Sequence, residues 1–455
     1  MKKNTEIGRR KFIKSAALGI AGVAVPAGAA GTRPKSPLKN REKDGLSPMV
    51  AQESPAAEMT PPRIKEYRVL GRTGFEVSDL ATGYIQDFGV FGMMLDAGVN
   101  CIDTGESYPG SHKLIGRVLK GRDRKKIFLN SKMQPEGDIT REGFLKRARK
   151  CLEDLETDYF DCMMLHLPER VETLKAEGFH AAMQELKTEG RVRFVGVSHH
   201  GSFWLRAPEQ SMDRVLLAAV EDGRFEVILM AYNFLQMDRG EEVIRAAKEK
   251  KIGITLMKTK PVGTYAVMKS MIEKLEKEGK EVDPLYRQGL ARYKDIADRA
   301  ETFIRKYNLQ NPEEVKEAAL RFALSHPDIH TVCCSAKTYA EAEQFLRQSG
   351  SRFSEKDGAT LARYKEACGA LYCRHACGVC ETDCPRGVPV NTIMRYQHYF
   401  AAQGREKEAM LKYARIPGAR AEECGHCPGH CERACPYGVP IQGMLLAAHD
   451  QLTLA

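Results

Sequence analysis

Short apolar stretches that alternate with amphipathic ones constrain the fold of this chain more than any other feature of its sequence. Between residues 77 and 347, patterns typical of strands and of helices follow one another along the chain. Eight strands interleaved with helices favour a (β/α)8 TIM barrel over an open, doubly wound sheet. The predicted strands are 77–84, 99–103, 126–132, 160–166, 192–198, 226–231, 252–257 and 329–334, and the predicted helices are 111–120, 141–155, 174–188, 213–222, 239–250, 312–325 and 338–347.

One segment does not fit a compact barrel. Residues 264–311 form a long, highly charged, helix-prone insertion between the last two predicted strands. We expect this insertion to cover part of the barrel or to connect with the C-terminal region.

Three successive predicted strands end in polar side chains. Asp103, Lys132 and His166 stand at these ends, and Tyr108 follows in the loop after the first strand. The carboxyl ends of the strands share one face of a parallel barrel, so the four side chains can converge there. Each residue alone has a structural explanation, such as a helix cap for Asp103 or core packing for His166. Those explanations do not account for all four residues in this order at successive strand ends.

Four motifs at these positions resemble those of the aldo-keto reductase family, and the resemblance extends over residues 65–350. It implies a catalytic tetrad of Asp103, Tyr108, Lys132 and His166, and a small carbonyl or alcohol substrate. The motifs are Asp103-Thr104 with Tyr108, Ser131-Lys132, the run from Asp161 to Pro168 that contains His166, and Gly196-Val197-Ser198.

The chemistry of carbonyl reduction gives each tetrad residue a role. Hydride addition leaves negative charge on the substrate oxygen, and an acid must neutralise it. A tyrosine hydroxyl is a weak acid, and a neighbouring ammonium lowers its pKa by stabilising the phenolate. We therefore expect Tyr108 to be the acid/base, Lys132 to tune it, Asp103 to hold Lys132, and His166 to orient the carbonyl oxygen.

The family resemblance also implies a nicotinamide cofactor, NADP(H). Ser198 would help hold the nicotinamide amide, Asn233 belongs to a matching Tyr-Asn pair, and Lys337 would meet a 2′-phosphate. An alternative is a barrel that kept the tetrad but changed its cofactor, because the sequence departs from the family pattern nearby. The departures are at His199-His200, Leu229 and Cys333-Cys334-Ser335.

Nine of the fourteen cysteines lie between Cys368 and Cys435. This clustering predicts metal binding rather than disulfides spread over the chain. Two runs share one pattern, each closed by Cys-Pro and followed by Gly-Val-Pro, which indicates an internal duplication. The runs are Cys373-x3-Cys377-x2-Cys380-x3-Cys384 and Cys424-x2-Cys427-x3-Cys431-x3-Cys435.

Each run resembles the C-x2-C-x2-C-x3-C-P run of bacterial ferredoxins, with one inserted residue. The resemblance implies two [4Fe–4S] clusters, held by these eight cysteines in a small, mainly helical dicluster domain. In two-cluster ferredoxins the fourth cysteine of a run ligates the other cluster, so we expect Cys384 and Cys435 to be exchanged. Two zinc sites with four cysteine ligands each are the alternative, although zinc ribbons more often separate two CxxC pairs by a long loop.

Residues 1–30 have the anatomy of a signal peptide, with a basic start, an Ala/Gly-rich apolar stretch and a small-residue site. The pair Arg9-Arg10 resembles a twin-arginine signal, which predicts export by the twin-arginine machinery to the periplasm or another extracytoplasmic space. An ordinary secretory signal, an amphipathic helix and an uncleaved membrane anchor are the alternatives. Residues 31–62 are rich in Pro, Ser and mixed charge, which predicts a flexible linker. The barrel is expected at 63–350 and the iron–sulfur domain at 351–455.

The positive charge of the chain lies mostly in this leader. Residues 1–60 contain 11 Lys and Arg against 5 Asp and Glu, whereas the whole chain has a net charge of +10. The remaining 395 residues therefore carry a net charge of only +4, and we expect no nucleic-acid partner.

These features together predict an exported oxidoreductase that interconverts carbonyl and alcohol and carries two iron–sulfur clusters. A second interpretation is an electron-transfer or docking protein, in which the barrel is an inactive scaffold and the clusters serve a redox partner protein. The sequence leaves the choice open, because hydride transfer moves two electrons whereas a cluster passes one at a time. No motif marks a flavin that could divide the pair.

Overall fold

We describe the protein from a computed structural model of residues 1–455. The described residues are 61–199, 210–261 and 284–453, except 310, 376 and 402. The predicted leader at 1–30, nearly all of the linker at 31–62 and the first part of the insertion lie outside them. Among the described residues, no helix has the length and apolar character needed to cross a membrane.

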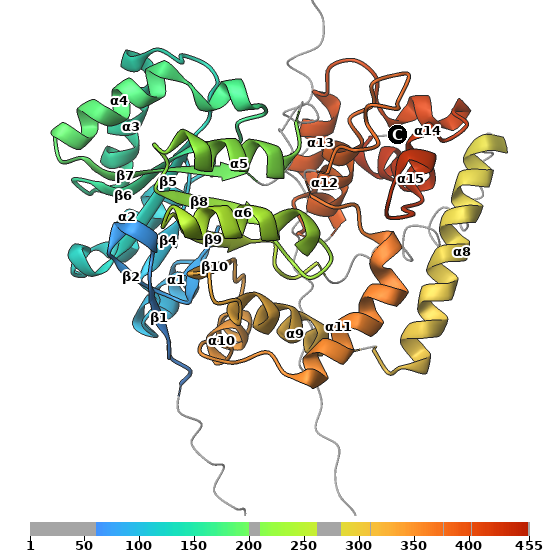
Figure 1. Ribbon diagram of the computed structural model, residues 1–455, viewed down its shortest axis with the longest axis horizontal. Helices are drawn as coiled ribbons and strands as arrows, with labels where there is room; N and C mark the ends of the chain where they lie inside the picture. Colours follow the sequence, from blue (N-terminus) through green and yellow to red (C-terminus); the bar gives the residue numbers. More distant parts are fainter. Residues whose placement is uncertain are drawn as a thin grey trace, which may run out of the picture. The chain divides into compact units, whose positions relative to one another are not determined.

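Eight parallel strands close into a barrel, as the alternating pattern predicts (Figure 1). The last strand pairs with the first, which closes the ring. The strands are β3 (Leu80–Thr82), β4 (Cys101–Asp103), β5 (Phe128–Met133), β6 (Phe160–His166), β7 (Val192–His199), β8 (Val227–Ala231), β9 (Gly253–Met257) and β10 (Thr331–Cys334).

A short hairpin precedes the barrel and corrects the first predicted strand. The predicted strand at 77–84 is two strands, because β2 (Glu76–Ser78) pairs antiparallel with β1 (Tyr67–Val69) while β3 joins the barrel. Leu70 and Val77 of this hairpin region are fully buried against the barrel interior.

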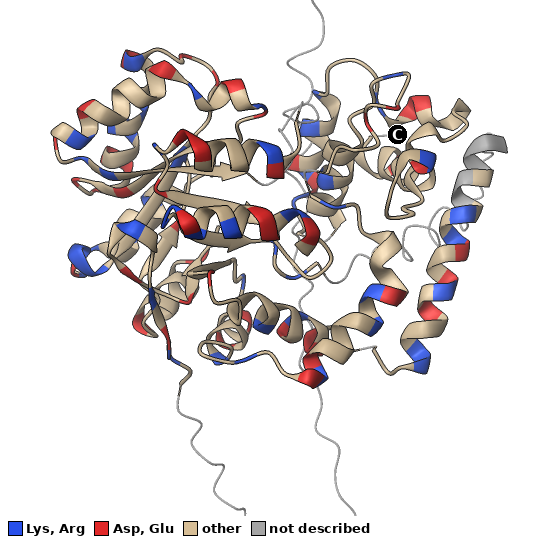
Figure 2. Cartoon of the chain, viewed as in Figure 1, with Lys and Arg blue, Asp and Glu red and all other residues tan. Residues whose placement is uncertain are grey.

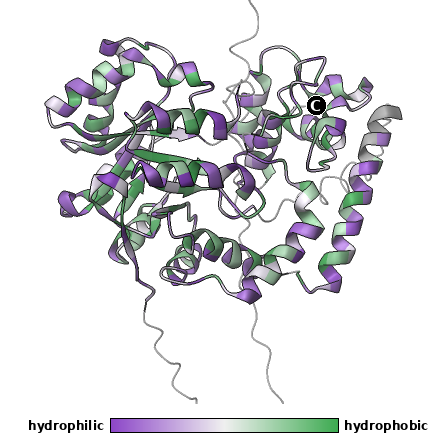
Figure 3. Ribbon diagram, in the orientation of Figure 1, coloured by the Kyte–Doolittle hydropathy of each residue, from purple (hydrophilic) through white to green (hydrophobic). Residues whose placement is uncertain are grey.

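Helices surround the strands and bury one face each. Helix α3, for example, begins after Thr140, whose side chain accepts a hydrogen bond from the Gly143 amide, and it buries residues at helical spacing such as Phe144, Ala148 and Leu152. The barrel helices are α1 (Phe88–Asp96), α2 (Ser111–Leu119), α3 (Arg141–Leu155), α4 (Glu177–Thr188), α5 (Met212–Asp222), α6 (Met237–Glu249), α9 (Pro312–Leu324) and α10 (Tyr339–Arg347). The surrounding helices show both green and purple along their length, as expected of amphipathic helices (Figure 3).

A second hydrophobic core holds the C-terminal helices together. It contains Phe234 and Leu235, which lie in the loop after β8, so this core reaches the carboxyl face of the barrel. Helix α8 (Pro284–Lys306), from the predicted insertion, packs on α15 and α11 and carries many charged residues (Figure 2). The other helices are α11 (Glu355–Cys368), α12 (Val390–Ala401), α13 (Glu406–Ala414), α14 (His430–Ala434) and α15 (Ile441–Leu452).

Candidate active site and cysteine pockets

The four predicted tetrad residues meet at the carboxyl face of the barrel. Asp103 is the last residue of β4, Lys132 lies near the end of β5 and His166 ends β6. Tyr108 follows β4 in a loop, and its ring lies 6.3 Å from the His166 ring, centroid to centroid, at 80°. In the parallel register Asp103 lies opposite Asn130 and Lys132 lies opposite Met164, so Lys132 and His166 each stand two residues beyond the level of the preceding site residue, at the same carboxyl face.

A buried ion pair forms the base of this site. The Lys132 ammonium donates hydrogen bonds to Asp103 Oδ2 at 2.6 Å and to the Thr104 carbonyl at 2.5 Å. Lys132 Nζ also lies 4.9 Å from the centroid of the Tyr108 ring. An ammonium has three donors, so one N–H of Lys132 is left for the Tyr108 side.

Tyr108 is more exposed than the three other residues of the tetrad. Lys132 and His166 are fully buried and Asp103 is 6% exposed, whereas Tyr108 is only partly buried. Tyr108 is therefore the member of the tetrad that a substrate arriving at the barrel face reaches first.

Burial and charge set the protonation of the site. Burial raises the pKa of Tyr108, and the positive charge of Lys132 opposes that rise without cancelling it. The sequence-based expectation that Lys132 sets a lowered tyrosine pKa thus misses the larger effect of burial. Burial and the charge of Lys132 lower the pKa of His166 well below 6.5. At neutral pH the site holds a protonated tyrosine and a neutral imidazole, both suited to hydrogen-bonding a carbonyl oxygen.

The predicted cofactor residues differ in how far they are already engaged. Ser198 is fully buried on β7, and its Oγ has no hydrogen-bond partner among the described residues. Lys337 is exposed, and its ammonium donates to the Gln403 carbonyl at 2.8 Å. The buried Asn233 donates to the Lys258 carbonyl and to the Tyr372 hydroxyl, and its Oδ1 accepts from the Leu235 amide.

These contacts test whether a nicotinamide cofactor fits. Buried polar atoms nearly always make a hydrogen bond, and the buried Ser198 hydroxyl has no partner among the described residues. The amide group of a nicotinamide ring could supply that hydrogen bond. The Lys337 ammonium keeps donors for a phosphate. Both Nδ2 hydrogens of Asn233 already donate hydrogen bonds within the protein. Only the second lone pair of its Oδ1 is left for a cofactor, so a role in cofactor binding stays a prediction.

Residues that the sequence did not single out extend the site. The Tyr84 ring lies 5.2 Å from the Tyr108 ring, and the guanidinium of Arg405 lies 5.8 Å from the Tyr84 ring and 5.0 Å from the Tyr399 ring. Lys258, directly after β9, places its Nζ 5.7 Å from the Tyr399 ring. Lys258 could have been found by the same strand-end reasoning as the tetrad. No sequence pattern marks Tyr399 and Arg405, which come from the C-terminal region.

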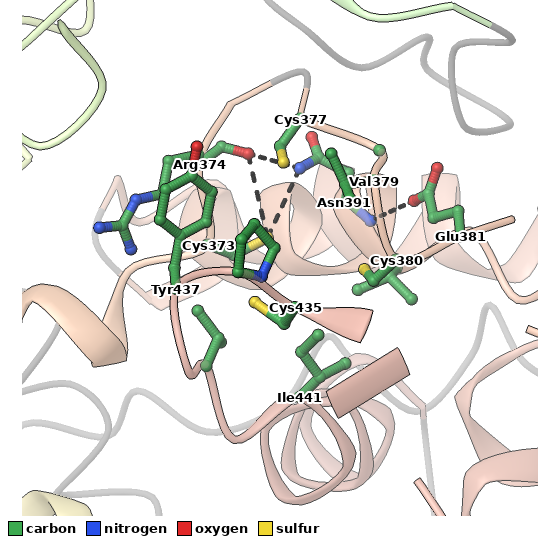
Figure 4. Close-up of a pocket in the computed structure, with 14 residues that line it drawn as sticks. Cys373, Arg374, Cys377, Val379, Cys380, Glu381, Asn391, Cys435, Tyr437 and Ile441 are labelled. Atoms are coloured by element: carbon green, nitrogen blue, oxygen red, sulfur yellow. Dashed lines mark hydrogen bonds between the residues drawn. The ribbon is translucent and has the colours of Figure 1, made fainter. Parts of the chain in front are cut away.

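The eight run cysteines line two separate pockets. One pocket, of about 330 Å³, is lined by three cysteines of the first run and by Cys435 of the second (Figure 4). The other, of about 310 Å³, is lined by Cys384 and by three cysteines of the second run. The first set is Cys373, Cys377, Cys380 and Cys435, and the second is Cys424, Cys427, Cys431 and Cys384.

The surroundings of the two pockets repeat each other. Glu381 follows the third cysteine of the first run and accepts from the Asn391 amide at 2.6 Å, and Glu432 in the second run accepts from the Gln442 amide at 3.2 Å. Gly387 and Gly438 both make the left-handed turn before the next helix, with φ of 65° and 63°. The duplication seen in the sequence is therefore a duplication of structure.

Burial disfavours the thiolate form of the cysteines in these pockets when no cation is bound. Burial raises the pKa of Cys373 and of Cys431 to about 12. Within the described residues no three His, Cys, Asp or Glu side chains are grouped closely enough to hold a single metal ion.

The loop of the first cysteine run is fixed to the barrel. Gln236, after β8, donates through Nε2 to the His375 carbonyl and accepts through Oε1 from the His375 amide, both at 2.7 Å. Asn233 reaches the Tyr372 hydroxyl at 3.1 Å, and Arg374 Nε donates to the Leu235 carbonyl at 3.2 Å. The pocket of Cys373 therefore belongs to the segment that contacts the carboxyl face of the barrel.

A closed parallel barrel with a buried Lys–Asp pair, a histidine and a tyrosine at its carboxyl face defines a barrel of the aldo-keto reductase type. The chain belongs to the Aldo/keto reductase family, whose sequence model matches residues 86–366, more than half of the chain. The match ends before the cysteine runs begin.

Curated relatives share only parts of this chain. Methylglyoxal reductase DkgB of Escherichia coli O157:H7 is 27% identical over 107 residues, which are 23% of this chain and 39% of that protein. L-galactose dehydrogenase of Arabidopsis thaliana is 31% identical over 154 residues, 29% of this chain and 48% of that protein. The chain thus spans less than half the length of these relatives. The solved structure of an aldo-keto reductase from Bacillus halodurans aligns with a TM-score of 0.49 at 20% identity, over 69% of this chain and 100% of that one.

Proposed function

We propose that this protein is an oxidoreductase that interconverts a carbonyl and an alcohol, with Tyr108 as its acid/base. The observation that carries the proposal is the arrangement at the barrel face: a partly buried tyrosine stands between a buried ammonium and a neutral histidine. Family membership and reductase relatives support the reaction class.

The side chains of the site account for the proton chemistry of reduction. The substrate oxygen accepts hydrogen bonds from the Tyr108 hydroxyl and from the neutral His166 ring. As negative charge develops on that oxygen, Tyr108 gives up its proton, and the Lys132 ammonium stabilises the phenolate that forms. Asp103 keeps Lys132 in place throughout. In the oxidation direction the Tyr108 phenolate takes the proton back.

We assign NADP(H) as the cofactor that supplies or accepts the hydride when bound. The unpartnered Ser198 hydroxyl at the strand ends supports this assignment, as does the exposed ammonium of Lys337. Family membership also favours it.

We further propose two [4Fe–4S] clusters, one in each cysteine pocket, with Cys384 and Cys435 exchanged. Each pocket offers four thiols, three from one run and one from the other, as in two-cluster ferredoxins. The four thiolates of a cluster bind four different irons, and each pocket offers four thiols for that purpose. Electrons passing through these clusters would connect the barrel to a redox partner protein.

Export by the twin-arginine route completes the proposal. Arg9-Arg10 in the basic leader supports it, and a protein that must receive clusters benefits from a route that carries folded cargo.

The substitution Tyr108→Phe tests the proposed reaction. We expect turnover of small aldehydes and ketones to fall by about 10²- to 10⁴-fold, the usual contribution of a positioned acid, while the iron content stays at the wild-type value. Tyr159→Phe is the matched control, because Tyr159 is also a partly buried tyrosine of the barrel but its hydroxyl contacts the Arg124 carbonyl, remote from the tetrad. Unchanged turnover in the Tyr108→Phe protein would show that Tyr108 is not the acid/base. Absence of turnover in the wild-type protein itself would favour the electron-transfer interpretation.

A further inference from the structure

The two halves of the C-terminal region correspond at positions that lie 51 residues apart in the sequence. Three of the four cysteines in each run follow this spacing, and so do the paired glutamates and glycine turns described above. Helices α12 and α15, which follow the two runs, begin and end at corresponding residues. The halves can therefore be compared position by position, and a difference between them marks a difference between the two cysteine pockets.

Two arginines of the first half have no arginine counterpart in the second half. Arg374 corresponds to Gly425, and Arg395 corresponds to Leu446. In the second half these two positions are neighbours, because a Cβ atom at Gly425 would lie 3.9 Å from Leu446 Cδ2. The second half thus has small and apolar residues where the first half carries two positive charges.

Both arginines are buried beside the first pocket. Arg374 lines the pocket and is 5% exposed, and its Nη1 donates to the carbonyls of Gly369 and Tyr372. Arg395 is 3% exposed, and its Nη1 lies 2.7 Å from His375 Nε2. A guanidinium can only donate, so the histidine nitrogen accepts and its ring is neutral. Within the described part of the chain, neither arginine forms an ion pair with a carboxylate.

Helix α12 brings the charge of Arg395 close to the ligands of the first pocket. Asn391 lies one turn before Arg395 on the same face of this helix, and its Nδ2 is 3.5 Å from Cys373 Sγ (Figure 4). Burial opposes the thiolate form of Cys373, and the charge of Arg395 favours it. Water screens buried charges poorly, so a positive charge at this depth acts more strongly than one on the surface.

Two cations near the second pocket are placed differently. Arg433 also contacts a histidine of a cysteine run, since its Nη2 lies 2.8 Å from His430 Nδ1, but Arg433 is exposed. Arg292 is 44% exposed and pairs with Glu432 at 3.0 Å. Glu381, the counterpart of Glu432, can offset only one of the two buried arginines of the first half. The first pocket therefore keeps an excess of buried positive charge.

We propose that Arg374 and Arg395 make the first pocket the one whose iron–sulfur cluster accepts an electron more readily, so that an electron shared by the two clusters stays on the barrel side. The proposal rests on the proposed function, because it takes the two clusters from there. Reduction adds one negative charge to a cluster, and buried positive charge beside it stabilises the reduced form and raises the reduction potential. Transfer of one electron between the pockets oxidises the second cluster and reduces the first by one electron each, and no bond forms or breaks.

The position of the first pocket gives this difference a direction. Gln236 holds the backbone of His375 by two hydrogen bonds, and Arg374 itself donates to the Leu235 carbonyl at 3.2 Å. Gln236 and Leu235 both lie in the loop after β8, at the carboxyl face of the barrel. A higher potential in the first pocket therefore draws electrons toward the barrel, and a one-electron donor protein would supply them through the second pocket.

A redox titration followed by electron paramagnetic resonance tests the proposal without relying on turnover. The cluster-loaded, full-length protein is titrated without air, and the signals of the reduced clusters are measured at each potential. Arg395→Gln and Arg374→Gln are introduced separately. Arg433→Gln is the matched control, because this arginine also contacts a histidine of a cysteine run but does so from an exposed position.

We expect two midpoint potentials, and Cys435→Ser should abolish the higher one by removing a ligand of the first pocket. Arg395→Gln should lower the higher potential by the equivalent of about a tenfold change in the equilibrium constant for reduction, which is about 59 mV for a one-electron couple. Arg374→Gln should act in the same direction. The lower potential should stay unchanged in both variants, and Arg433→Gln should leave both potentials unchanged.

Iron content shows that a potential is compared between intact pockets, and Arg374→Gln supplies the result if Arg395→Gln loses iron. Equal midpoint potentials, survival of the higher one in Cys435→Ser, or a higher potential that neither arginine substitution moves at full iron content would overturn the proposal. The proposed function fails in other ways. A wild-type protein with far fewer than about eight irons refutes the clusters, and absence of turnover refutes the carbonyl reaction.

Discussion

The barrel face and the cysteine pockets solve the problem of buried charge in opposite ways. At the barrel face the charges of the tetrad are already paired, because Lys132 and Asp103 form an ion pair without any ligand. In the cysteine pockets, eight thiols face two cavities, and burial raises the pKa of thiols such as Cys373 and Cys431 to about 12. The first site is organised by the protein alone, whereas the thiols of the second would need a bound cation, such as the irons of the clusters we propose, in order to deprotonate.

This contrast predicts that the two regions depend differently on iron. Removal of the clusters by chelation under reducing conditions should abolish amide hydrogen-exchange protection in α12 and α15, which carry Asn391 and Gln442 beside the pockets. The barrel strands should keep their protection, because their core is separate from the pockets. Hydrogen exchange followed by mass spectrometry measures both regions in one sample. Equal loss in both regions would mean that the barrel relies on the clusters, and equal retention would mean that the pockets need no metal.

The buried ion pair between Lys132 and Asp103 contributes to the stability of the barrel only while both partners are present. Lys132→Met leaves the Asp103 carboxylate buried without its partner, so we expect the free energy of barrel unfolding to fall by about 3–5 kcal/mol. The midpoint of denaturant unfolding, followed by hydrogen exchange of the barrel strands, measures the loss.

A double variant and a surface control sharpen this test. Asp103→Asn combined with Lys132→Met removes both charges and should recover part of the stability lost in the single variant. Lys150→Met should have no measurable effect, because Lys150 pairs with Asp154 on an exposed helix surface. A single variant as stable as the wild type would show that the Asp103 carboxyl is neutral, and the contrast between the two sites would disappear.

Much of the barrel could be predicted because its strands, its helices and the tetrad positions each follow from a pattern in neighbouring residues. Helices α2 and α3 begin where the periodicity predicts, and the four tetrad residues lie where the strand-end rule puts them. Helix α1 was not predicted. It contains Gly89 and Gly92, which weaken the helical signal, and its start depends on Asp87, whose side chain accepts from the Val90 amide.

The rest of the site depends on contacts that no local pattern records. Tyr399 is placed near Tyr108 by α12, whose docking depends on Gln236, Asn233 and the cysteine loop. Asn233 and its partner Tyr372 are 139 residues apart in the sequence, and so are Gln236 and its partner His375. The duplicated cysteine spacing predicted two groups of four ligands, and it could not predict that the first pocket lies on the segment fixed to the barrel.

The exchange of cysteines gives a more selective test of the C-terminal region. Cys435→Ser should remove only the cluster of the first pocket, so the iron content should fall from about eight to about four per chain. Cys373, Cys377 and Cys380 should then react with a thiol reagent, while Cys384 and the three remaining cysteines of the second run stay protected. Cys384→Ser is the matched control and should give the opposite pattern. Protection of Cys373 in the Cys435→Ser protein would show that each run holds its own cluster.

The smallest expected effect is on the pH dependence of the two reaction directions. Reduction needs a protonated Tyr108 and a neutral His166. Burial raises the pKa of Tyr108 and lowers the pKa of His166. At any pH between these two pKa values, Tyr108 is protonated and His166 is neutral. The kcat/KM for reduction should therefore be nearly flat from about pH 7 to about pH 9, and its lower bound should lie well below the usual histidine pKa near 6.5.

Oxidation should respond with the opposite sign, because it needs the Tyr108 phenolate. Below the raised pKa of this tyrosine the phenolate fraction increases about tenfold for each pH unit, so kcat/KM for alcohol oxidation should rise steadily with pH. The residual activity of Tyr108→Phe, which has no hydroxyl to titrate, supplies the baseline. Loss of reduction activity above an inflection near pH 6.5 would mean that His166 is charged when it works. The barrel face would then resemble the cysteine pockets, where a bound partner and not the fold sets the protonation state.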